Sequence, residues 1–168
     1  MTSKITVRPA RTSDVKAIQA MRQQLEGSKV LLGHELVTLY EAVPEFLVAV
    51  DETGSVVGAG ALHVMWEDLA EVRSMVVSEA LRGTGVGHAV LEALLAKAQS
   101  VGIKRVFCLT FETQFFGKHG FEEISDVPVD ESTFEQMVRS HDDGVAEFLD
   151  LARVKQNTLG NTRMLKAL

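Results

Sequence analysis

The spacing of apolar residues along the chain predicts a succession of strands and helices. Residues 4–8 (KITVR) alternate in polarity, which predicts an edge strand. Apolar residues then recur at helical spacing from Val15 to Leu25, which predicts a helix that Gly27 ends. A second helix is predicted over residues 35–43 (ELVTLYEAV), and Pro44 ends it.

A meander of three strands is predicted next. Runs rich in β-branched residues cover 45–52, 56–66 and 69–77, and short breaks containing Gly, Asp or Ser separate them. These breaks are too short for a crossover connection, so the three strands are expected to be antiparallel.

The segments after the meander predict a parallel pair of strands. A helix is predicted over residues 86–100 with Gly102 at its end, and a strand over 106–111 follows it. Because a helix between two strands forms a crossover, the strand at 106–111 is expected to lie parallel to the strand at 71–77.

The C-terminal part of the chain has weaker patterns. A short helix within 115–121 (FFGKHGF) and a strand over 121–127 (FEEISDV) are predicted. Residues 132–153 are predicted to be mainly helical, and 162–168 (TRMLKAL) a last strand. Residues 1–168 are therefore expected to form a single α+β domain, with helices flanking a mixed and mostly antiparallel sheet.

Charge and composition exclude several classes of protein. The chain has 17 Lys and Arg against 23 Asp and Glu, without the concentrated basic face that a general nucleic-acid binder needs. Its longest apolar stretch, Val56–Trp66, is shorter than the ~20 residues that span a bilayer. The first residues also lack the apolar core of a signal peptide. We therefore expect a cytoplasmic protein that binds neither membrane nor nucleic acid.

The segment 82–87 (RGTGVG) carries the most specific chemistry. It lies between a predicted strand and the start of a predicted helix, where converging backbone N–H groups and the helix dipole favour an anion such as a phosphate. The alternative is a plain glycine-rich connection. A Walker loop would end in Gly-Lys-Ser/Thr, which is absent from the sequence. A Rossmann turn would require Gly or Ala at His88 or Val90 and would open a parallel sheet.

The pattern Arg82-x-x-Gly85-x-Gly87, preceded by Met75-Val76-Val77 and followed by 115–121, resembles the acetyl-CoA signature of the GNAT N-acetyltransferases. The resemblance implies the GNAT fold, with a central pair of parallel strands that splay apart, and acetyl-CoA as co-substrate. It places the pantetheine at the main chain of Met75, Val76 and Val77. It places the pyrophosphate at Arg82, Gly83, Thr84, Gly85, Val86, Gly87 and His88.

Residues 31–168 also resemble the acetyltransferase part of N-acetylglutamate synthases, with one insertion near 140–158. The closest parts are the meander, LTFETQFFGKHGF and the closing NTRMLKAL. This resemblance implies transfer of acetyl from acetyl-CoA to the α-amino group of L-glutamate, the first step of arginine biosynthesis, by direct attack in a ternary complex. The kinase-like domain of many synthases is not in this sequence, so a short form without arginine feedback through that domain is expected.

Acetyl transfer needs a base, because the α-ammonium of an amino acid is largely protonated at neutral pH. Glu71 is the candidate base, since the resemblance places its strand at the thioester; the alternative is a solvated glutamate. Arg73 shares a sheet face with Glu71 and is a candidate for the substrate carboxylate, with an ion pair to Glu71 as the alternative.

Other positively charged residues are further candidates for the substrate carboxylate. Arg163 lies in the tail motif NTRML and matches the basic residue of the synthase signature, with a surface charge as the alternative. Lys118 and Lys29 are weaker candidates, because exposed lysines are usually only solvated.

Several further residues bear on the chemistry. We expect a bulge near Ser74–Val76, where freed backbone N–H groups could stabilise an oxyanion. Phe116 stands where the superfamily often has the tyrosine that protonates the leaving thiolate, and it is expected to contact the coenzyme. Cys108 is expected to be a buried, inert thiol, with a covalent acetyl-cysteine as the less favoured alternative. The histidines show no metal-ligand spacing, so no metal is predicted.

Two other functions stay open. The acceptor could be another amine, such as L-glutamine, a polyamine, an antibiotic or a protein N-terminus, or the domain could sense CoA without turnover. The family resemblance also suggests a homodimer formed through the C-terminal strands.

Overall fold

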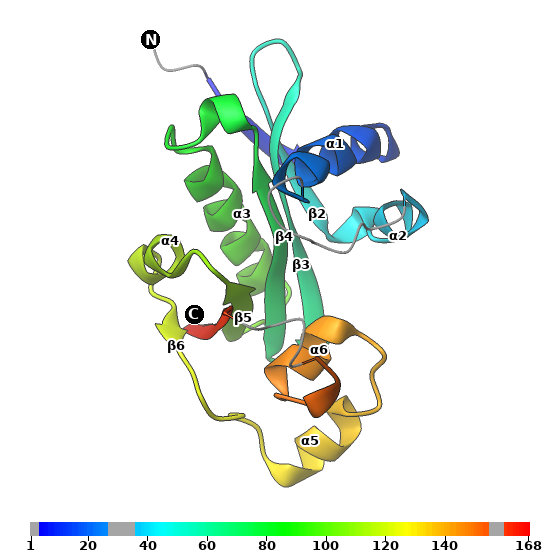
Figure 1. Ribbon diagram of the computed structural model, residues 1–168, viewed down its shortest axis with the longest axis vertical. Coiled ribbons are helices and arrows are strands. Elements are labelled where there is room, and N and C mark those ends of the chain that lie inside the picture. The colour runs from blue at the N-terminus through cyan, green and yellow to red at the C-terminus, as the bar shows by residue number, and fades with distance from the viewer. Residues whose placement is uncertain (1–3, 27–35, 155–159) are drawn as a thin grey trace. The chain divides into compact units, whose positions relative to one another are not determined.

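The structure is a computed structural model that describes residues 4–26, 36–154 and 160–168. Figure 1 shows the arrangement of its helices and strands. The strands are β1 (Thr6–Pro9), β2 (Phe46–Val50), β3 (Val56–Trp66), β4 (Leu69–Val77), β5 (Arg105–Thr110), β6 (Glu122–Glu123) and β7 (Thr162–Ala167). The α-helices are α1 (Val15–Glu26), α2 (Leu36–Glu41), α3 (Val86–Ser100), α4 (Thr113–Lys118), α5 (Glu131–Met137) and α6 (Asp143–Phe148).

The strands form one sheet in the order β1-β2-β3-β4-β5-β7-β6. β1 pairs with β2 and β2 with β3 in antiparallel fashion, and β7 is antiparallel to both β5 and β6. β4 and β5 are parallel, with Leu69 opposite Arg105 and Glu71 opposite Phe107. The parallel pair predicted from the intervening helix is confirmed, and its register runs from Leu69 to Glu71.

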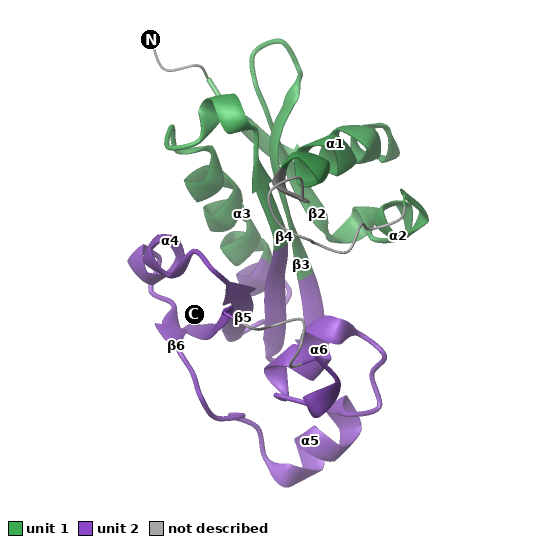
Figure 2. Ribbon diagram, viewed as in Figure 1, with its two compact units in different colours: residues 1–62, 74–97 green, residues 63–73, 98–168 purple. Residues whose placement is uncertain are grey.

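The chain divides into two compact units, 1–62 with 74–97 and 63–73 with 98–168 (Figure 2). In the first unit, α1 and α2 pack on a buried cluster that includes Ala59 and Ala61 of β3. The alternate residues Gly58 and Gly60 point to the opposite face, where a Cβ on either glycine would overlap side chains of α3. These two glycines therefore let α3 pack closely on β3.

In the second unit, α5 and α6 cover the start of the parallel strand pair. Leu69 of β4 and Phe107 of β5 are fully buried and cluster with side chains of both helices. The rings of Phe107 and Phe148 lie 5.3 Å apart between centroids. Because residues two apart on a strand share a face, Glu71 and Arg73 lie on the face that carries Leu69.

The tail is mainly helical over 132–153, as predicted, and its helix is divided into separate pieces. Asp142 begins the separate helix α6 by accepting the backbone N–H of Val145 at 3.0 Å, and Asp150 has a φ of +56°, which cannot continue a helix. The predicted strand over 121–127 is reduced to Glu122–Glu123, whereas the last strand is confirmed as β7. None of the described helices is long and apolar enough to cross a membrane. Lys29 lies outside the described residues, and the prediction of one domain over 1–168 stays a prediction.

Candidate active site

The predicted pyrophosphate segment forms an exposed turn between β4 and α3. Gly83 and Gly85 have φ values of +78° and +97°, a region that L side chains rarely adopt. Arg82, Gly83, Thr84 and Gly85 are exposed, and the Thr84 N–H donates to the Leu81 carbonyl. The two glycines thus allow a tight turn directly before the helix.

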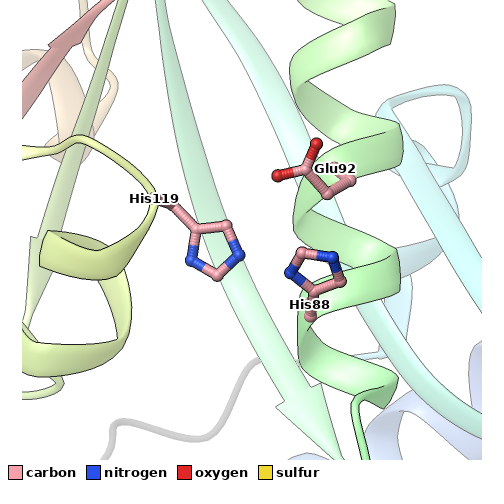
Figure 3. A group of neighbouring side chains, drawn as sticks. All are labelled: His88, Glu92 and His119. Atoms are coloured by element: carbon pink, nitrogen blue, oxygen red, sulfur yellow. The ribbon is translucent and has the colours of Figure 1, made fainter.

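Helix α3 then begins at Val86, and Gly85 provides the carbonyl that accepts the Ala89 N–H at 3.0 Å. The first N–H groups of a helix have no partner within it, which leaves those of Val86, Gly87 and His88 directed out of its N-terminus. The Val86 side chain itself is buried, so only its backbone is suited to an anion. His88 and Glu92 are four residues apart and lie on one side of α3 (Figure 3).

The end of β4 carries the predicted pantetheine residues. Ser74 has a φ of +59°, an unusual value for a residue other than glycine, at the start of the segment where a bulge was predicted. Val76 is buried in the core, whereas Met75 and Val77 are half-buried. The Met75 side chain occupies space that a Cβ on Gly60 would fill. The side chains of Met75 and Val76 are engaged in packing, so backbone groups are what a ligand could use here.

Glu71, the predicted base, is buried at 5% exposure in the second unit. Burial raises the pKa of its carboxyl to about 7, with Asp142 raising it further while Arg73 and His63 lower it. Its Oε1 lies 2.7 Å from Arg73 Nε in an ion pair. A buried carboxyl whose pKa lies near neutral pH is suited to proton transfer.

The Arg73 guanidinium joins two carboxylates. Its Nε faces Glu71, and its Nη1 and Nη2 donate to Asp142 Oδ1 at 2.9 Å and Oδ2 at 2.8 Å. Burial raises the pKa of Asp142, but the hydrogen bonds and charge of Arg73 outweigh it, and the pKa is lowered overall. The ion pair with Glu71, one of the two interpretations of Arg73 from the sequence, is therefore formed in this structure.

Helix α6 adds a glycine and a second carboxyl to the surroundings of Glu71. A Cβ on Gly144 would overlap the Glu71 carboxylate, so the carboxylate lies directly against this backbone. Glu147, three residues further along the helix, is buried, and burial together with the charges of Glu71 and Asp143 raises its pKa to about 7.

The remaining predicted residues lie elsewhere in the second unit. Arg163 on β7 donates through Nε and Nη2 to the backbone carbonyls of Glu147, Asp126 and Phe148, and burial lowers its pKa. Lys118 is exposed in the last turn of α4. These contacts hold the Arg163 guanidinium against the chain.

Helix α4 places Phe116 in an aromatic cluster. Its buried ring meets those of Phe115 and Phe121 edge to face, at 5.1 and 5.2 Å between centroids. His119, just beyond the helix, lies with its Nδ1 2.9 Å from the Phe115 carbonyl. Phe116 thus contributes apolar packing and has no proton to donate.

Comparison with known proteins identifies the family. Residues 17–121, more than half of the chain, match the acetyltransferase (GNAT) family. An amino-acid acetyltransferase of Mycobacterium tuberculosis is 56% identical over 164 residues, which cover 96% of this chain and 94% of that protein. The chain belongs to the GNAT acetyltransferase family. This GNAT acetyltransferase is an enzyme that uses acetyl-CoA, as the resemblance to the GNAT signature implied.

Solved structures share the fold of this acetyltransferase. A crystal structure from Mycobacterium tuberculosis, determined in complex with CoA and NLQ, matches with a TM-score of 0.91 and 55% identity, covering 97% of this chain and 99% of that one. The N-acetylglutamate synthase of Neisseria gonorrhoeae, complexed with coenzyme A and N-acetyl-glutamate, matches with a TM-score of 0.77 and 23% identity. That match covers 98% of this chain but 35% of the synthase, and it supports the GNAT fold class.

Three residues that surround Glu71 in this acetyltransferase were not predicted as site residues from the sequence, namely Asp142, Gly144 and Glu147. All three belong to the segment that was predicted to be mainly helical. The run Ser-His-Asp-Asp-Gly at 140–144 was the available signal, since Asp is a preferred helix N-cap and Gly a weak helix former.

Proposed function

We propose that this acetyltransferase transfers the acetyl group of acetyl-CoA to the α-amino group of L-glutamate, with Glu71 as the base. The observation that carries the proposal is the buried Glu71 carboxyl, with its pKa near 7, on the strand that continues into Met75–Val77. The amino-acid acceptor is supported by the closely similar Mycobacterium tuberculosis amino-acid acetyltransferase. The same reaction would place the protein in arginine biosynthesis.

In the proposed reaction, the Glu71 carboxylate accepts a proton from the substrate ammonium, and the freed amine attacks the thioester carbon. The C–N bond forms, the C–S bond breaks, and the nitrogen loses its second proton to water. The CoA thiolate departs without an acid from Phe116, which is tolerable because a free thiol has a pKa of ~8.5. Backbone N–H groups near Ser74–Val76 are the proposed donors to the oxyanion, and the amides from Arg82 to His88 are proposed to hold the pyrophosphate.

Recognition of the substrate carboxylates is also part of the proposal, with Arg73, Arg163 and Lys118 as the candidate cations. The Nε and Nη2 atoms of Arg163 donate hydrogen bonds to neutral backbone carbonyls, so its Nη1 edge is suited to a carboxylate. Arg73 would first have to release Asp142. Lys118 is exposed and would contribute a screened charge. A homodimer remains a separate prediction.

L-glutamine is a second candidate acceptor, favoured by the charges in the structure. The charge of Asp142 raises the pKa of Glu71, and the charge of Glu71 raises the pKa of Glu147. Arg73 is already paired with two acids. Such surroundings repel the side-chain carboxylate of L-glutamate, but they do not repel the uncharged side-chain amide of L-glutamine.

An acceptor panel distinguishes these functions. CoA release from acetyl-CoA is followed with a thiol reagent in the presence of L-glutamate, L-glutamine, L-aspartate, spermidine or a short peptide, and products are identified by mass spectrometry. We expect the highest kcat/KM with L-glutamate. A higher value with L-glutamine would favour the second candidate, and a higher value with spermidine or the peptide would overturn the amino-acid proposal. CoA binding without any release would indicate a sensing module.

A further inference from the structure

We propose that Asp142 is a positioning residue for acetyl transfer, whose carboxylate holds the Arg73 guanidinium against Glu71. The inference rests on the proposed function, because it takes Glu71 to be the base. It assigns a role to the segment that begins α6, which no sequence pattern connected with the chemistry.

The first support is the geometry of the Arg73–Asp142 pair. Two parallel hydrogen bonds of 2.9 and 2.8 Å fix the plane of the guanidinium, because both carboxylate oxygens are engaged by separate nitrogens. The third edge of the same guanidinium, Nε, lies 2.7 Å from Glu71 Oε1. A guanidinium is rigid, so fixing two of its nitrogens also fixes the third relative to Glu71.

The second support is that Asp142 is itself held by the chain. Its Oδ2 accepts the Val145 N–H at 3.0 Å as the N-cap of α6, and its own N–H donates to Ser140 Oγ at 3.1 Å. A carboxylate bound in this way belongs to the folded structure. Asp142 therefore differs from a substrate carboxylate, which must bind and dissociate in each catalytic cycle.

The third support is the close approach of α6 to Glu71. Gly144 lies two residues after Asp142, and the absence of its Cβ gives the Glu71 carboxylate its room. The first turn of α6 therefore touches the proposed base through Gly144 and orients it through Asp142 and Arg73. Both contacts are lost together if this turn moves.

The charged groups around Glu71 make the inference testable by pH. They are Arg73 on its own strand, His63 on β3, Asp142 and Glu147 from the α6 segment, and Cys108 on β5. Arg73 and His63 favour the carboxylate form, whereas Asp142 and Glu147 oppose it. Removing the charge of Asp142 alone would therefore make Glu71 a stronger acid, but releasing Arg73 would make it a weaker one.

The test is the pH dependence of kcat/KM in Asp142→Asn. Asparagine keeps the helix cap but presents an amide NH₂ to one guanidinium nitrogen, so the paired hydrogen bonds cannot both form. We expect kcat/KM at neutral pH to fall about 10- to 100-fold, as a small misplacement of a catalytic group can cause. The acid limb of the profile should also move up by about one pH unit, because Glu71 loses an opposite charge.

The matched control is Asp130→Asn, which makes the same change at the N-cap of α5, where Asp130 accepts the Thr133 N–H at 2.7 Å. It should leave kcat and the pH profile unchanged. In an Arg73→Lys background, Asp142→Asn should add little, because the paired hydrogen bonds are already absent. Circular dichroism and the CoA dissociation constant show whether each variant is folded.

Each contrary outcome has its own meaning. An acid limb that moves down would make Asp142 only a nearby charge, and an unmoved limb would make it only a helix cap. A lower KM for the amino acid with unchanged kcat would mean that Asp142 merely occupies the substrate's place on Arg73. Any of these results overturns the inference. An acid limb that persists in Glu71→Gln would instead overturn the proposed role of Glu71.

Discussion

The proposed coenzyme segment, residues 75–88, and the surroundings of Glu71 are built in opposite ways. The segment from Met75 to His88 is continuous in sequence, and its proposed donors are backbone amides that two positive-φ glycines expose. The surroundings of Glu71 consist of buried side chains from distant parts of the chain, such as Arg73 and Asp142, which are 69 residues apart. Local backbone conformation thus defines the first region, and long-range packing defines the second.

The largest expected effect comes from Glu71→Gln, which keeps the shape of the side chain and removes the base. General-base catalysis contributes roughly 10²- to 10⁴-fold, so we expect kcat to fall by that factor. Steady-state kinetics with saturating acetyl-CoA measure it, and the CoA dissociation constant should be unchanged because the coenzyme segment is not altered. Full activity in this variant would remove Glu71 from the mechanism.

The same substitution should stabilise the protein at high pH. Glu71 has a folded pKa of about 7 against an ordinary 4.5, so the folded state binds the proton more tightly than the unfolded state. This stabilisation is complete below pH 4.5 and is lost as the pH rises through 7. The shift corresponds to a decrease of up to about 3 kcal/mol in the free energy of unfolding of the wild-type protein. Glutamine does not ionise, so the variant does not show this decrease.

Chemical denaturation of both proteins at pH 5 and pH 8 measures this difference in the free energy of unfolding. The advantage of Glu71→Gln should grow between the two pH values, whatever constant offset the replacement of a protonated carboxyl by an amide introduces. An advantage that is equal at both pH values would mean that Glu71 is not a buried titrating group.

This contrast explains which features the sequence predicts. Glycines at 83 and 85 and the helix after them are local signals, and the parallel pairing of β4 with β5 follows from the helix that connects them. Burial of Glu71 depends on α6, whose start at Asp142 lies inside a segment for which the pattern predicts only a mainly helical structure, without its separate helix starts. Residue types and spacing therefore suggested Glu71 and Arg73, but not the acid that joins them.

A smaller effect is expected from Gly85→Ala in the coenzyme segment. An L side chain at φ +97° costs roughly 1–2 kcal/mol, so the turn either strains or moves its amides. Because 1.4 kcal/mol corresponds to a factor of ten, we expect the dissociation constant for CoA to rise about tenfold, with little change in the acid limb. Isothermal titration calorimetry measures the binding.

Gly54→Ala is the matched control for this prediction. Gly54 lies in the turn between β2 and β3 with a φ of +83°, and a Cβ at either glycine meets no atom within 4 Å. Both variants should lose similar stability, but Gly54→Ala should leave CoA binding unchanged. Equal binding losses in the two variants would show that general destabilisation, and not the turn at Gly85, governs the affinity.

The smallest effect is expected at Cys108, which tests whether a thiol of the protein, in addition to the substrate amine, acts as a nucleophile. Cys108 is buried on β5 at 1% exposure, and burial together with the charge of Glu71 raises the pKa of its thiol. A thiol that does not ionise is a poor nucleophile, so Cys108→Ala should retain kcat within about twofold, and iodoacetamide should modify Cys108 only after unfolding. An acetyl group found on Cys108 after mixing with acetyl-CoA alone, together with inactivity of Cys108→Ala, would replace direct attack with a covalent intermediate. In that case Glu71 would first deprotonate the Cys108 thiol, and the acetyl group would pass from the coenzyme to Cys108 before the amine reacts.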